Sequence, residues 1–205
     1  MTAATVTDRL AAIENYLFDY RVVKDFSEIE IEEIMNYNTI IRNRAKIEAC
    51  IENAKRFNAI INRHGSFANY IESFGNLDED RSLEALKHEL MKFKFLGPRT
   101  AYYFMLDMGL KVWKPDRVIC RILLRLNLID SKDNIEQAVK VGKKIADEVG
   151  MPIRYVDIIF VKYGQRGEEK PFGLKNGICL EKNPRCSICG IQKYCTFLYK
   201  NSTGR

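Results

Sequence analysis

The sequence predicts an all-α fold, and three observations lead to that prediction. Apolar residues recur three and four positions apart along most of the 205-residue chain, which is the period of a helix with one buried face. The sequence contains no convincing run of alternating apolar and polar residues, the pattern typical of a strand. With 46% hydrophobic residues, 12 Gly and 5 Pro, the chain can bury a core and is neither fibrous nor disordered.

The first third of the chain contains three predicted helices. A helical apolar repeat predicts the first over residues 6–19. Ser27 followed by Glu30 is a capping-box pattern, which predicts a short helix running to Met35. A long amphipathic helix is expected over 42–62, followed by Gly65 as its C-terminal cap. The expected apolar face of this long helix consists of Ile47, Ile51, Ala54, Phe57 and Ile61.

The rest of the chain is predicted to continue as short helices joined by turns. Residues 93–97 are expected to form a tight turn, and Pro98 occupies the first position of the next helix, where proline is favoured. The predicted helices are 66–74, 82–92, 98–108, 116–126, 133–149 and 152–163, with a loop over 164–177.

The charge is unevenly distributed along the chain. The formal net charge is +6. Residues 1–80 hold 9 Lys and Arg against 14 Asp and Glu, whereas residues 81–205 hold 24 against 13. The second part is therefore strongly basic, which favours an anionic partner without proving one.

The sequence also suggests a compartment. It contains no apolar run of about 18 residues, so no membrane span is expected. The first residues lack the basic-then-apolar order of a signal peptide, which predicts a cytoplasmic protein. In that reducing compartment the six cysteines are expected to be metal ligands or buried thiols rather than disulfides.

Four cysteines form the strongest chemical pattern: Cys179, Cys186, Cys189 and Cys195. Such a compact set can surround one metal centre, because the two residues between Cys186 and Cys189 let both sulfurs face it. Zinc sites usually pair two such short spacings and only one is present, so a [4Fe-4S] cluster is favoured, with zinc as the alternative. Cys50 and Cys120 lie on apolar helix faces and are expected to be buried thiols.

The second pattern is the segment from Phe93 to Ala101, a glycine-containing turn followed by a helix that opens with Pro98. The start of that helix exposes backbone N–H groups and the positive end of the helix dipole, which together can hold a phosphate. Lys92, Lys94 and Arg99 add positive charge around the turn. An ordinary connection between two helices is the competing interpretation.

The third pattern is Asp116, followed by Arg117, Arg121 and Arg125. A carboxylate at the start of a helix is most often an N-cap. The arginines that follow suggest a cationic helix face, and a carboxylate beside bound polyanion is suited to stabilise a cationic sugar or to activate water.

In this order, the three patterns resemble the helix-hairpin-helix DNA glycosylases, specifically the endonuclease III branch that carries a [4Fe-4S] cluster. The hairpin motif of that family matches at Gly97, Thr100 and Ala101, and its catalytic aspartate falls on Asp116 with Arg121 in the arginine position. The cysteine spacing is that of the family. The resemblance implies Asp116 as catalytic residue, the four cysteines as cluster ligands, and Lys94, Gly97, Arg99, Thr100 and Arg121 as DNA contacts.

A second resemblance is to 3-methyladenine DNA glycosylase I. Residues 40–49 look like the Ile-Ile-Arg-x-Arg-x-Lys-Ile segment of that family, and Phe93 to Gly97 looks like its Phe-x-Phe-Val-Gly hairpin. By this likeness Ile40 or Ile41 would fill the gap left by an extruded base, with Arg42 and Arg44 beside it on the DNA. A hydrophobic staple is the competing interpretation of the two isoleucines.

The chain also departs from these families. Arg99 stands where bifunctional relatives have the Schiff-base lysine, and a guanidinium cannot act as that nucleophile. Phe95 replaces the first glycine of the hairpin, which predicts a locally different turn. The helices that supply base-pocket residues in both families have no clear counterpart before residue 20, which implies an open pocket or reduced activity.

Taken together, the resemblances imply a two-lobed helix-hairpin-helix glycosylase fold with a C-terminal iron-sulfur loop. We place one lobe at 22–112 and the other at 113–205 together with the helix 6–20. The implied function is a monofunctional DNA glycosylase of base excision repair, a nucleoid-associated monomer acting on duplex DNA with a damaged or mismatched base. The alternatives are a glycosylase with lyase activity and a non-catalytic iron-sulfur sensor of DNA lesions.

Overall fold

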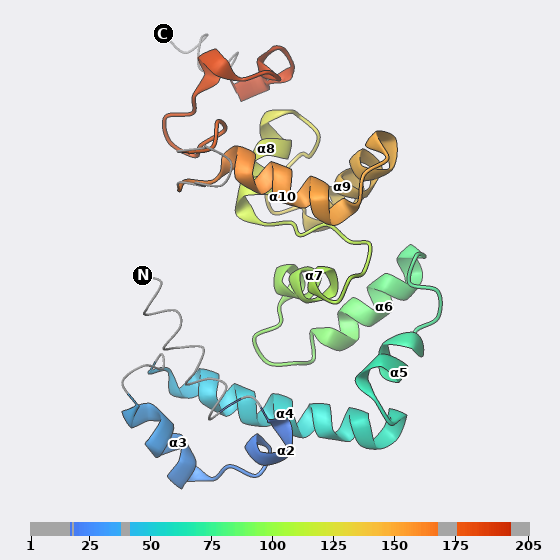
Figure 1. The fold of residues 1–205 in the computed structure, drawn as a ribbon, viewed down its shortest axis with the longest axis vertical. Coiled ribbons are helices and arrows are strands. Elements are labelled where there is room, and N and C mark those ends of the chain that lie inside the picture. The colour runs from blue at the N-terminus through green and yellow to red at the C-terminus, as the bar shows by residue number, and fades with distance from the viewer. Residues whose placement is uncertain (1–16, 18, 38–41, 168–175, 198–205) are drawn as a thin grey trace. The chain divides into compact units, whose positions relative to one another are not determined.

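The computed structural model describes residues 17, 19–37, 42–167 and 176–197 of the chain (Figure 1). Every regular element in these ranges is a helix, which confirms the all-α prediction. The chain forms two compact units, residues 1–97 and 98–205, called unit 1 and unit 2 from here on. The lobe boundary predicted after residue 112 lies further along the chain than this junction and stays a prediction.

Unit 1 contains five of the described helices. They are α2 (Tyr20–Val23), α3 (Glu28–Asn36), α4 (Arg44–His64), α5 (Phe67–Glu72) and α6 (Asp80–Leu90). The last four lie within two residues of the predicted ranges, whereas α2 was not predicted. The helix predicted over 6–19 lies almost entirely outside the described residues.

The long helix α4 is the support on which α2 and α3 pack. Ile47, Ile51 and Ala54 of its predicted apolar face are buried against Val23 and Ile34. The Ser27–Glu30 capping box starts α3 as predicted. At the other end of α4, Gly65 adopts φ +76°, a conformation that favours glycine, and its N–H caps the carbonyl of Ile61.

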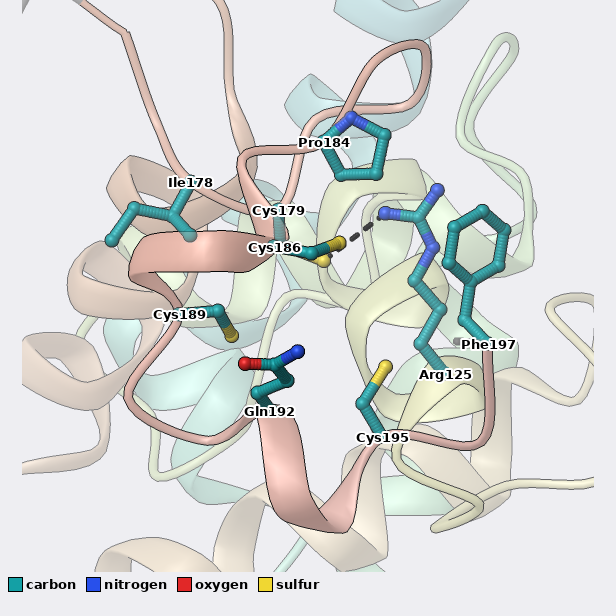
Figure 2. Close-up of a pocket in the computed structure, with 9 residues that line it drawn as sticks. All are labelled: Arg125, Ile178, Cys179, Pro184, Cys186, Cys189, Gln192, Cys195 and Phe197. Atoms are coloured by element: carbon teal, nitrogen blue, oxygen red, sulfur yellow. Dashed lines mark hydrogen bonds between the residues drawn. The ribbon is translucent and has the colours of Figure 1, made fainter. Parts of the chain in front are cut away.

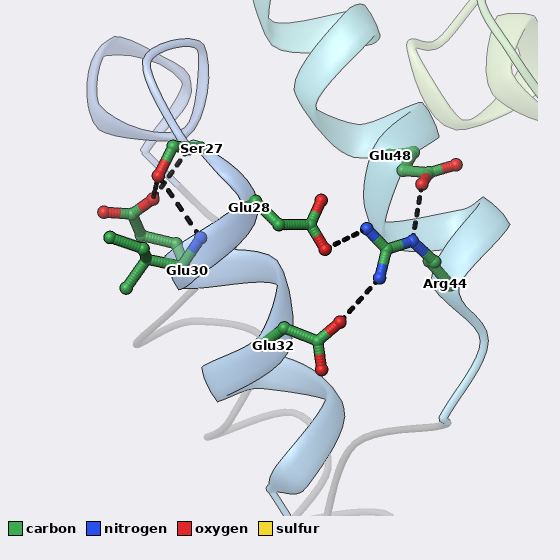
Figure 3. A network of polar contacts seen from close by, with 7 residues as sticks. Ser27, Glu28, Glu30, Glu32, Arg44 and Glu48 are labelled. Carbon is green, nitrogen blue, oxygen red and sulfur yellow. Dashed lines mark hydrogen bonds and ion pairs between the residues drawn. The ribbon is translucent and has the colours of Figure 1, made fainter.

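An ion-pair cluster joins the start of α4 to α3 (Figure 3). The Arg44 guanidinium pairs with Glu28, with Glu32 at 2.6 Å and with Glu48 at 2.8 Å. Isolated exposed pairs contribute little, but three carboxylates around one guanidinium form a network that holds its side chain in one position.

The described residues of unit 2 form four α-helices and two short 3-10 turns. They are α7 (Pro98–Asp107), α8 (Arg117–Arg125), α9 (Ile135–Val149), α10 (Ile153–Gly164), η2 (Cys186–Ile188) and η3 (Gln192–Tyr194). Helices α8, α9 and α10 pack against one another around Trp113, which is fully buried and meets the Phe160 ring edge-on at 4.9 Å. No helix in the described part of the chain is long and apolar enough to span a membrane.

Replacement of Gly142 by alanine should destabilise unit 2. A Cβ atom added to Gly142 would lie 1.2 Å from Cε3 of Trp113, so the indole ring would have to move. Such overpacking costs about 1–3 kcal/mol, which exceeds the gain of up to about 1 kcal/mol that alanine offers in a helix. Urea unfolding of Gly142→Ala measures the loss, and Lys140→Ala on the exposed side of α9 is the control. A variant as stable as the wild type would contradict this packing.

Candidate functional site

Asp116 stands at the N-terminus of α8, and its side chain acts as the helix cap. One carboxylate oxygen accepts a hydrogen bond from the N–H of Ile119 at 2.8 Å. The N-cap interpretation is therefore confirmed. No other hydrogen bond to this half-buried carboxylate is found among the described residues, which leaves its second oxygen for another partner.

The segment that delivers Asp116 is held on both sides. From α7, Arg99 donates to the carbonyl of Pro115 and, at 3.3 Å, to that of Lys132. From α10, the Asp157 carboxylate accepts a hydrogen bond from the backbone N–H of Lys114. Because the residues just before Asp116 are tied to two helices, the position of its carboxylate is set by tertiary contacts as well as by the cap.

Asp157 is a second carboxylate near Asp116 and is almost completely buried. It is 1% exposed, and one of its oxygens has no hydrogen-bond partner. The other oxygen lies 3.6 Å from Arg154, whose guanidinium also lies 3.5 Å from Asp107. Burial raises the pKa of Asp157, and the nearby positive charges of Lys114 and Arg154 oppose that shift.

Tyr103 completes the surroundings of Asp116. The Lys114 ammonium group lies 5.1 Å from the centre of its ring, within the range of a cation–π contact. Burial and the negative charge of Asp116 raise the pKa of Tyr103 to about 12, so its hydroxyl stays protonated at neutral pH. Asp116 thus has a neutral hydroxyl and several charged side chains in its electrostatic surroundings.

Cys179, Cys186, Cys189 and Cys195, the four predicted metal ligands, line one cavity of about 280 Å³, a volume that includes its opening to solvent (Figure 2). All four are partly buried and none is in a disulfide. Within the described residues, no group of three or more His, Cys, Asp or Glu is placed to hold a metal ion. The thiols therefore surround a space instead of meeting at a single point.

Two arginines of α8 hold the segment 176–197, which carries the four cysteines and is called the cysteine loop from here on. Arg125 donates to the Cys179 sulfur at 3.1 Å and to the carbonyl of Leu180 at 2.7 Å. Its guanidinium lies 4.1 Å from the centre of the Phe197 ring, which Figure 2 shows beside the cavity. One turn earlier, Arg121 donates to the carbonyls of Gly164 at 2.6 Å and Cys179 at 3.1 Å. The predicted cationic face of α8 thus binds protein carbonyls along Arg121 and Arg125.

Helix α10 holds the other side of the cysteine loop. The N–H groups of Ile178 and Cys179 both donate to the carbonyl of Tyr163, at 2.7 and 2.8 Å. Gly177 lies so close to the end of α10 that a Cβ there would be 2.7 Å from the same carbonyl oxygen. The Tyr163 hydroxyl lies 3.0 Å from the Cys189 sulfur. These contacts position two of the four thiols.

The predicted hairpin turn, residues 93–97, forms the end of unit 1. The Asn53 amide accepts from the N–H of Lys94 at 2.7 Å and donates to its carbonyl at 3.1 Å. Phe95 adopts φ +64°, the left-handed conformation that a glycine favours, and its side chain is 62% exposed. Phe95 stands where the hairpin motif has its first glycine, and its backbone keeps the left-handed conformation that glycine adopts more readily than phenylalanine.

The other predicted DNA contacts lie in different surroundings. Arg42 precedes α4 and is exposed, as are Lys94 in the turn and Thr100 in the first turn of α7, while Gly97 ends unit 1 half-buried. The guanidiniums of Arg44, Arg99 and Arg121 all bind groups of the protein itself. Ile40 and Ile41 lie outside the described residues. DNA contact by all these residues stays a prediction.

Several site residues were not found from the sequence. Asp157 and Tyr163 occupy α10, far along the chain from the groups they contact, and no local pattern marks them. Arg125 was noted as part of a cationic face, but not as a partner of a cysteine. The four-residue spacing of Arg121 and Arg125 was the available signal, because it places both side chains on one side of α8.

Comparison with known proteins bears on the first half of the chain. The family model of methyladenine glycosylase matches residues 9–115, which is more than half of the sequence. The chain belongs to the methyladenine glycosylase family. The match ends just before Asp116, so Asp116 and the loop with the four cysteines lie outside the region that the family model covers.

A curated relative agrees with this assignment. The chain is 33% identical over 109 residues to the DNA-3-methyladenine glycosylase of Haemophilus influenzae, covering 45% of this chain. The chain covers 59% of the length of that relative. No solved structure matches the chain significantly. The predicted likeness to 3-methyladenine DNA glycosylase I is confirmed at the level of the family, and the endonuclease III likeness stays a proposal.

Proposed function

We propose that the protein is a DNA glycosylase of base excision repair that hydrolyses the N-glycosidic bond of a damaged base in duplex DNA. Membership of the methyladenine glycosylase family carries this proposal. The held position of Asp116, with one carboxylate oxygen unengaged, supports it. The fold proposed with this function is the two-lobed helix-hairpin-helix glycosylase fold.

Asp116 is the proposed catalytic residue. With the target nucleotide extruded from the stack, the C1′–N bond breaks and its electron pair leaves with the base. Positive charge then develops on the sugar, where a carboxylate stabilises it. The free oxygen of Asp116 orients a water molecule, whose oxygen bonds to C1′ while its proton passes to the carboxylate.

The proposed enzyme is monofunctional. Arg99 occupies the position of the Schiff-base lysine, and a guanidinium cannot attack C1′ as an amine does. Its guanidinium instead donates to the carbonyl that precedes Asp116. The monofunctional proposal follows from both facts. The rival is a bifunctional enzyme in which Lys94 or another lysine is the nucleophile, and borohydride trapping of a covalent DNA adduct would reveal it.

A [4Fe-4S] cluster is the proposed cofactor, held by Cys179, Cys186, Cys189 and Cys195. The donor set fits, because four thiols line one cavity and an arginine N–H already points at one of the sulfurs. A cluster of several atoms suits thiols arranged around a space better than one zinc ion, which requires its ligands within about 2.3 Å. If bound, the cluster would cross-link the four thiols of the loop and would supply no group to the hydrolysis.

An excision screen tests the proposed function. Duplexes that each carry one alkylated, oxidised, deaminated or mismatched base are incubated with excess protein, and abasic sites are revealed by alkaline cleavage. Release of an alkylated adenine is the expected result, since the curated relative is named for 3-methyladenine. Binding of all duplexes without release from any would instead identify a non-catalytic sensor of lesions.

A further inference from the structure

The exposed side of α4 in unit 1 forms one continuous concave surface with the end of α6 and the hairpin turn. Two adjoining hollows, of about 610 and 840 Å³ counted to open solvent, share Arg56, Ala59 and Lys92 in their walls. We call this surface the α4 groove. It runs along α4 from Glu52 to His64 and includes Lys94 of the predicted hairpin.

The α4 groove is basic although unit 1 is acidic. Residues 1–97 hold 13 Lys and Arg against 16 Asp and Glu. Five of those cations line the groove with only two carboxylates, Glu52 and Glu89. The cations are Lys55, Arg56, Arg63, Lys92 and Lys94. Positive charge is thus concentrated on one face of a unit whose net charge is negative.

In the part of the chain that the structure describes, three of these cations have no carboxylate partner. Glu89 pairs with Lys92, and Glu52 lies 3.4 Å from Lys94. Within the described residues, no ion pair is found for Lys55, Arg56 or Arg63, and the Arg56 guanidinium lies 5.9 Å from the centre of the Phe93 ring. All three are exposed. Like charges that are left unpaired along one groove repel one another, which a polyanion would relieve.

We propose that the α4 groove binds the phosphate backbone of duplex DNA, in continuity with the hairpin turn. This inference rests on the proposed glycosylase function and adds to it a contact surface that the sequence motifs do not mark. The lysines at the turn and the cations along α4 lie on one surface, so a strand that reaches Lys94 meets Arg56 next. The lysines and arginines of the groove are long charged donors suited to phosphate oxygens, and contacts to phosphate carry no sequence information.

Neutralising the groove tests the inference. Binding of the full chain to a fluorescent, undamaged duplex is measured by anisotropy as a function of salt. The double variant Arg56→Gln and Arg63→Gln should bind at least about tenfold more weakly, and the slope of log K against log[salt] should become shallower by about 0.9 for each lost phosphate contact. Arg81→Gln is the matched control for Arg63→Gln, because Arg81 is an exposed cation of unit 1 outside the groove.

The outcomes separate this inference from the proposed function. Equal weakening by Arg63→Gln and Arg81→Gln, or an unchanged salt slope in the double variant, would overturn the groove contact while excision by the wild type remained. Conversely, a wild type that binds DNA through the groove but releases no base would refute the glycosylase and leave the groove contact standing.

Discussion

Asp116→Asn should lose excision by at least about 100-fold while keeping its affinity for DNA. Asparagine retains an oxygen that can accept from the N–H of Ile119, and it is as good an N-cap as aspartate, so α8 should keep its start. What disappears is the negative charge that stabilises the sugar and the base that takes a proton from water. The measurement is the single-turnover excision rate together with the dissociation constant for the same damaged duplex.

The control for Asp116→Asn is Asp147→Asn, which removes one carboxylate from the exposed side of α9 in the same unit. It should excise at the wild-type rate. Retained excision in Asp116→Asn would remove Asp116 from the proposed mechanism, while the hydrolysis itself would stand and need another group to activate water. Loss of both excision and thermal stability would instead show that the carboxylate mattered as a cap, and a stable Asp116→Ser variant, which keeps a capping oxygen without a carboxylate, would then decide between the two roles.

Removing one of the four proposed cluster ligands should abolish the cluster and loosen the cysteine loop. Protein purified without oxygen should contain four irons and four acid-labile sulfides per chain and absorb visible light. Cys189→Ala should lose both the iron and the colour. Without the cluster, the described part of the loop would be held by its hydrogen bonds to α8 and α10 alone. Protease should therefore cut the variant within residues 176–197 faster than the wild type.

Cys50→Ala is the matched control for the cysteine variants, since Cys50 is a partly buried thiol of unit 1 that packs against the α4 core. It should keep the full iron content. One zinc per chain and no iron in the wild type would refute the cluster and establish the alternative that the cysteine spacing left open. Iron content unchanged in Cys189→Ala would show that the metal is held elsewhere.

The helices of this protein were largely predictable because each carries local signals. The capping box of Ser27 and Glu30, Gly65 after α4, and Pro98 at the start of α7 act over three or four residues, and all three stand where predicted. Apolar spacing likewise identified the buried face of α4. Such features depend on backbone geometry that neighbouring residues determine by themselves.

Side-chain partners were less predictable, because they come from distant parts of the chain. A DNA contact by Arg44 stays a prediction, but no sequence signal indicated that its guanidinium pairs with three carboxylates, two of them from α3. Likewise, a DNA contact by Arg121 stays a prediction, and the sequence did not indicate that its guanidinium donates to the carbonyls of Gly164 and Cys179. An arginine has the same charge in every setting, so its partner is decided by which acceptors the fold brings within reach.

The sequence by itself determined the all-α class, the cap at Asp116, the burial of Cys120 and the compact set of four cysteines. Only the tertiary structure decided that α8 carries Asp116 at one end and grips the cysteine loop with Arg125 at the other. It also revealed Asp157 beneath the segment before Asp116 and gathered the cations of α4 into one groove. Caps and spacings are local, whereas these contacts join residues about 40 or more positions apart, and only packing of the helices against one another brings such residues together.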